Sequence, residues 1–115
     1  MPSSRCLHHN DFGLISQCPN GCCLHLCFGN VALCLKPAEL ADWRTDLALL
    51  YRLHAPRLVD PQARGLTLPG AGPRQAFVFT LEEVFLLQDL LTGAALLLEA
   101  ESILASAISG AKSAG

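Results

Sequence analysis

The fold is decided by residues 13–36, which read GLISQCPNGCCLHLCFGNVALCLK. Short apolar runs bounded by turn residues are typical of strands. Pro-Asn-Gly after Cys18 and Gly-Asn after Phe28 are tight-turn sequences, because Pro fixes φ while Gly and Asn tolerate a positive φ. The segment therefore predicts an antiparallel meander of three strands, at residues 13–18, 23–28 and 31–36.

The middle strand has two different faces. Side chains alternate across a strand, so Leu24, Leu26 and Phe28 share one face. Cys23, His25 and Cys27 share the other. A second cluster of metal ligands on the face of His25 is an alternative, and a surface or hydrogen-bonded imidazole is the favoured interpretation of this residue.

The rest of the chain predicts two helices and a hairpin. Pro37 opens a helix that fades near His54, because Pro is favoured in the first turn. Thr80 followed by Glu83 is a capping-box pattern at the start of a long, Leu- and Ala-rich helix. These patterns predict one α+β domain, residues 1–115, in which the long C-terminal helix packs on one sheet. Its parts are a Cys-rich β-meander (1–36), a helix (37–54), a β-hairpin (64–79), the long helix (80–108) and a frayed tail (109–115).

The long helix is apolar on two sides. Leucines from Leu87 onward form a wide face suited to the core, and Phe85, Leu96 and Ile103 lie on the other side. A second apolar stripe is hard to bury inside so small a monomer. We therefore expect a homo-oligomer, or another protein partner, through this helix.

The composition narrows the class of protein. The chain has 115 residues, 51% hydrophobic and 16% charged, with a net charge of −2, which gives no support for nucleic-acid binding. Its longest apolar run is far shorter than the roughly 20 residues of a membrane helix, and the N-terminus lacks the apolar segment of a secretory signal. We expect a cytoplasmic protein outside the membrane. Its six cysteines then favour metal ligation or burial over disulfides.

The first hairpin predicts a structural Zn²⁺ site. Cys18 and Cys22 flank Pro-Asn-Gly with three residues between them, within the range seen for paired zinc ligands. The chain entering the hairpin adds Cys6 and a histidine. The predicted ligands are Cys6, His8 or His9, Cys18 and Cys22, with Cys23 as a substitute for Cys22.

Other interpretations of the cysteines stay open. A free cysteine behaves as a small hydrophobe, and Cys34, among Val, Ala and Leu, is expected to be packed. A thiol-based redox protein or sensor using Cys18, Cys22 and Cys23 is the alternative function, although their turn leads into a strand and lacks the helix N-terminus that lowers a thiol pKa. No pattern of residues indicates a catalytic site, so we expect a non-catalytic protein.

Residues 11–40, DFGLISQCPNGCCLHLCFGNVALCLKPAEL, resemble a family of small bacterial proteins of the Bacteroidota type. The likeness rests on an early Cys6, the turn at Cys18, LHLCFGN at residues 24–30 and TLEEVFLLQDLL at residues 80–91. The family pattern has two residues between the knuckle cysteines, whereas here Gly21 occupies the second cysteine's place and Cys22 follows. The resemblance implies a fold and a lineage, and no activity.

Overall fold

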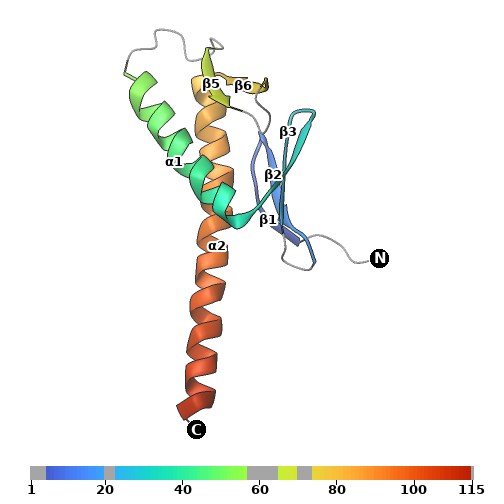
Figure 1. Ribbon diagram of the computed structural model, residues 1–115, viewed down its shortest axis with the longest axis vertical. Helices are drawn as coiled ribbons and strands as arrows, with labels where there is room; N and C mark the ends of the chain where they lie inside the picture. Colours follow the sequence, from blue (N-terminus) through green and yellow to red (C-terminus); the bar gives the residue numbers. More distant parts are fainter. Residues whose placement is uncertain (1–4, 20–22, 57–64, 70–73, 115) are drawn as a thin grey trace.

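The computed structural model describes residues 5–19, 23–56, 65–69 and 74–114. The chain is α+β, as predicted, with two helices and two antiparallel sheets in the described part (Figure 1). In chain order the elements are β1 (Arg5–His9), β2 (Gly13–Gln17), β3 (Leu24–Phe28), β4 (Val31–Leu35), α1 (Pro37–His54), β5 (Leu66–Pro69), β6 (Ala76–Phe79) and α2 (Leu81–Ala114).

The first sheet is a four-stranded meander in the order β1-β2-β3-β4. The predicted alternation of β3 is confirmed, because Leu24, Leu26 and Phe28 are buried while the residues between them are only partly covered. The predicted turn between β3 and β4 is also present. Gly29 there has a φ of 55°, which glycine adopts without steric cost.

Strand β1 is an addition to the three predicted strands. Its sequence, RCLHH, has two histidines and an arginine in five residues and gives little strand signal. Tertiary contacts form it: β1 pairs with β2, and a register shift between Cys6 and His8 leaves Leu7 to point into the core. The turn before β2 is fixed by Asn10, whose side-chain oxygen accepts the backbone N–H groups of Phe12 and Gly13.

Both helices begin as the sequence predicts. The side chain of Glu39 accepts the N–H of Lys36 at 2.9 Å at the start of α1. At the start of α2, Glu83 N–H donates to Thr80 Oγ1 (3.1 Å) and Thr80 N–H donates to Glu83 Oε1 (2.9 Å), which is the reciprocal capping box.

The core lies between the inner face of the four-stranded sheet and the N-terminal half of α2, with α1 packed along the same half of that helix (Figure 1). Beyond this body α2 extends alone, and its C-terminal end lies far from every other element (Figure 1). The fully buried side chains from these elements include Ile15, Leu24, Leu26, Leu47, Leu66, Val84, Leu87, Leu90 and Leu91.

Two details differ from the prediction. The hairpin of β5 and β6 forms a sheet of its own, so the helices do not pack on one sheet only. Helix α2 also continues to Ala114 through most of the expected frayed tail. Alanine is the strongest helix former, and it recurs often enough in this segment to carry the helix past Gly110.

Candidate metal centre

Three ligand-type side chains meet on the outer face of the four-stranded sheet. The ligand atoms of Cys23, His25 and Cys34 all lie within 4.8 Å of one another. Cys23 immediately precedes β3, His25 lies within it, and Cys34 lies in the neighbouring strand β4. Cys23 and His25 are half-buried and Cys34 is exposed, so the group opens toward solvent.

The strand register explains why these residues meet. His25 and Cys34 are direct partners across β3 and β4, and directly opposite side chains on one face are close neighbours. Cys23 is two residues before His25 and therefore lies on the same face. The sheet backbone thus fixes His25 and Cys34, and Cys23 adjoins the first residue of β3.

The spacing of the group suits zinc. Bond lengths of about 2.3 Å to sulfur and 2.0–2.1 Å to nitrogen place tetrahedral ligands about 3.6 Å apart for a sulfur–nitrogen pair and about 3.8 Å apart for two sulfurs. Cys23 Sγ lies 3.7 Å from His25 Nε2. Two thiolates and an imidazole also match the ligand types that zinc selects. The group can hold a metal ion with only small side-chain movements.

Among the cysteines predicted as ligands, Cys23 belongs to the group and Cys6 and Cys18 do not. Cys6 is in β1, two strands from His25, which corresponds to about 10 Å at the usual strand spacing. Its Sγ donates to the backbone oxygen of His8 at 3.6 Å. Cys18 follows β2, and its N–H donates to the oxygen of Cys23 at 3.1 Å, which joins the two sides of the hairpin connection. Cys22 lies outside the described residues.

The two predicted histidine ligands do not join the group. His9 is exposed at the end of β1. His8 lies against α2, where its Nε2 is 3.0 Å from Asp89 Oδ2. The side-chain amide of Asn10 donates to the same oxygen at 2.9 Å, and this bond, with a smaller contribution from His8, lowers the pKa of Asp89 although burial opposes it. This polar cluster connects β1 and the turn after it to α2.

Cys27 and Cys34 both lie on the outer face of the sheet, but only Cys34 belongs to the ligand group. Cys34 was expected to be packed, and this expectation is wrong, because its side chain is exposed beside His25. The strand has the core on one side only, and the register places Cys34 on the other side. Cys27 shares the outer face but pairs with Ala32 and lies outside the group.

The comparisons give no relative from which a function can be transferred. The chain matches no protein-family model, no curated protein and no solved structure. The resemblance to a Bacteroidota-type family stays a prediction.

Proposed function

We propose that this chain is a non-catalytic cytoplasmic protein in which Cys23, His25 and Cys34 hold a structural zinc ion and α2 makes the functional contact with a second copy. The convergence of the three ligand atoms within 4.8 Å carries the metal part of the proposal. Three protein ligands leave one position of a tetrahedral ion for water or an outside donor.

The position of the group supports a structural role for the ion. Cys34 is in β4, which has only one partner strand in the described sheet, so β4 is an edge strand. A metal joining β3 to β4 fixes that edge at a point beyond the backbone hydrogen bonds. Because the folded state binds the ion and an unfolded chain lacks the site, binding adds directly to folding stability.

The metal test compares two matched cysteine variants. Protein purified without a histidine tag is expected to contain about one zinc per chain. Cys34→Ser removes a ligand and is expected to lose the metal, whereas Cys27→Ser, on the same face of the sheet, is expected to keep it. Cobalt substitution adds a spectroscopic readout, since tetrahedral thiolate-bound cobalt absorbs in the visible. Substoichiometric metal together with an unchanged melting temperature under chelator contradicts the proposal.

The contact surface is the apolar stripe on the projecting part of α2. Leu96, Ile103 and Leu104 are between 56% and 62% exposed, and Phe85, from the predicted stripe, is 57% exposed. Leu97 and Leu104 are seven residues apart, as are Leu96 and Ile103. A seven-residue repeat keeps apolar side chains on the seam between two helices, so the stripe fits another helix.

The same seam is already used inside the chain. Leu90 and Gly93 precede Leu97 in the repeat; Leu90 is fully buried, and the ring of His8 covers Gly93. Beyond Gly93, Arg5 of β1 still pairs with Glu101 beside the seam, while Leu97 is 37% and Leu104 is 61% exposed. An α2 helix from a second copy continues the packing that β1 begins.

A membrane is the competing partner for this stripe. Leu81–Ile108 is long and apolar enough to cross a membrane by length and composition. However, Glu99 and Glu101 fall in its exposed part, and a charged side chain near the bilayer centre costs about 2.5–3.5 kcal/mol even on the most favourable scale. Glu101 also pairs with Arg5 of β1. These charges favour a protein partner in water.

Light scattering at micromolar concentration tests the contact. The native chain is expected to be a dimer and Leu104→Glu a monomer, because the variant places a charge in the seam. Ser102→Glu adds the same charge nearly opposite on the helix and is expected to leave the dimer intact. A native monomer overturns this part of the proposal. A monomer that co-sediments with lipid vesicles would show that the stripe contacts a membrane and not a second copy.

A further inference from the structure

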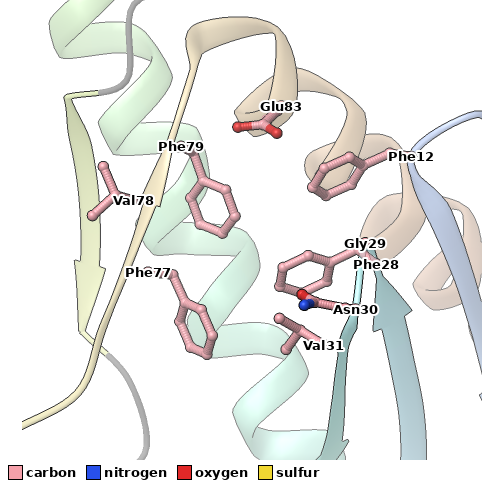
Figure 2. Close-up of a pocket in the computed structure, with 9 residues that line it drawn as sticks. All are labelled: Phe12, Phe28, Gly29, Asn30, Val31, Phe77, Val78, Phe79 and Glu83. Atoms are coloured by element: carbon pink, nitrogen blue, oxygen red, sulfur yellow. The ribbon is translucent and has the colours of Figure 1, made fainter.

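A second site lies away from the metal centre, where the β3–β4 turn, β6 and the start of α2 meet (Figure 2). It is a cavity of about 240 Å³ that opens to solvent. Four of the chain's five phenylalanines line it: Phe12, Phe28, Phe77 and Phe79. Figure 2 shows the rings of Phe12 and Phe79 on either side, Phe28 below them, and the carboxylate of Glu83 above.

The rings are spaced for a single small cation. The ring centroids of Phe12, Phe28 and Phe79 are separated by 5.1, 5.8 and 6.5 Å. A point equidistant from all three and about 4 Å above their plane is about 5 Å from each, inside the roughly 6 Å reach of a cation–π interaction. Phe12 and Phe28 are nearly parallel, and Phe79 is tilted by 70° and 56° to them, so the rings form two walls of a corner.

The charged group that lines the cavity is the carboxylate of Glu83, in the first turn of α2. The helix N-terminus contributes only about half a positive charge, which is less than the full charge of one carboxylate. The first-turn amides of Glu83 and Val84 already donate to Thr80, which removes them as donors for an anion. The cavity therefore disfavours phosphate or carboxylate ligands.

We propose that this pocket, formed by Phe12, Phe28, Phe79 and Glu83, binds a methylated ammonium group. The methyl groups would contact the apolar walls while the positive charge faces the rings and the carboxylate. At about 240 Å³ the cavity is smaller than the roughly 300–1,000 Å³ of drug-sized pockets, so it suits a headgroup or one side chain. This site is independent of zinc and of the α2 seam.

Choline and dimethylbutanol, its neutral carbon isostere, have the same shape, and only choline carries a charge. The difference between their affinities therefore measures the contribution of the charge to binding. In an NMR titration of the folded chain, choline is expected to shift the amide signals of Gly29 and Asn30, with a dissociation constant of about 1–10 mM. Dimethylbutanol is expected to bind at least about fivefold more weakly. Equal binding of the two compounds, or no saturable shifts with choline, overturns the proposal. Phosphocholine and free trimethyllysine, titrated next, distinguish a lipid headgroup from a modified peptide.

Two variants localise the binding. Glu83→Gln keeps a side-chain oxygen for the capping bond to Thr80 and removes only the charge, so choline is expected to bind about fivefold more weakly while dimethylbutanol is unchanged. Phe12→Leu keeps an apolar side chain in the wall of the pocket. It is expected to weaken the binding of choline more than the binding of dimethylbutanol. Glu82→Gln, in the same turn but outside the lining, serves as the matched control. Choline binding that is insensitive to both Glu83→Gln and Phe12→Leu contradicts the site.

Discussion

Replacing Gly93 by alanine tests the packing between β1 and α2. A Cβ built at this position would lie 2.4 Å from Cγ of His8 and 2.6 Å from two further ring atoms. Ordinary contact requires the ring to move by about 1 Å, which lengthens its 3.0 Å bond to Asp89 beyond hydrogen-bonding range. A glycine inside a helix is normally a weakness, so its value here comes from the space it leaves for His8.

The two effects of the substitution have opposite signs. Alanine gains about 1 kcal/mol in helix propensity over glycine. Displacing His8 loses a half-exposed hydrogen bond, about 0.5–1.5 kcal/mol, and adds an overpacking cost of about 1–3 kcal/mol. Gly93→Ala is therefore expected to destabilise the native chain by about 0.5–3.5 kcal/mol, the difference between these contributions. In a His8→Ala background the clash is absent, and the same change is expected to stabilise by about 1 kcal/mol.

A double-mutant cycle checks this reversal of sign. Urea unfolding of the four proteins is monitored by circular dichroism at constant metal content. Ala105→Gly in both backgrounds is the control, because it probes helix propensity at an exposed position of α2 away from both His8 and the seam. Its cost of about 1 kcal/mol is expected to be the same with and without His8. If Gly93→Ala has the same sign in both backgrounds, the histidine ring does not occupy this position.

Three further predictions follow from local contacts. Gly13→Ala is expected to destabilise by about 2 kcal/mol or more in urea unfolding, because its Cβ would lie 2.0 Å from the backbone oxygen of Cys27, which cannot move away as a side chain can. The lowered pKa of Asp89 implies stability that is fully present above its unfolded pKa of about 3.9 and lost as pH falls through the lower folded pKa. Unfolding of metal-free protein at a series of acidic pH values should show this loss. The free energy of unfolding should depend less on pH in Asp89→Asn than in the native chain. Thiol titration should find two fewer fast-reacting thiols with zinc than without it, and these should be Cys23 and Cys34; uniform reactivity in both states contradicts the ligand set.

Local sequence chemistry was sufficient for most of the fold. The capping pair Thr80 and Glu83, the proline at the start of α1 and the Gly-Asn turn each act within a few residues, and the structure contains all three. Strand β1 could not be foreseen in this way, because its five residues are held by pairing with β2 and by packing against α2, which lies far away in the sequence.

The metal group illustrates the same limit at a site. The alternation of β3 already placed Cys23 and His25 on one face. Cys34 joins them only through the pairing register of β3 with β4, which depends on a two-residue turn. Counting residues outward from that turn on both strands pairs His25 with Cys34. The position of the turn was therefore the sequence signal that could have identified this pair. Composition instead indicated packing for Cys34.

The four-stranded sheet has most of its buried apolar residues on its inner face, whereas Leu14 on the outer face is 40% exposed. The inner face is covered by α2, whereas the described outer face has no second layer of structure. The strands of an open sheet that is covered on one face are held by interstrand backbone hydrogen bonds and by side-chain packing on the covered face. A zinc ion held by Cys23, His25 and Cys34 would join β3 to β4 on the face that has no second layer in the described residues. On the proposed function, a bound zinc would stabilise the side of the sheet opposite α2, and the exposed apolar residues on the projecting part of that helix would face the second copy.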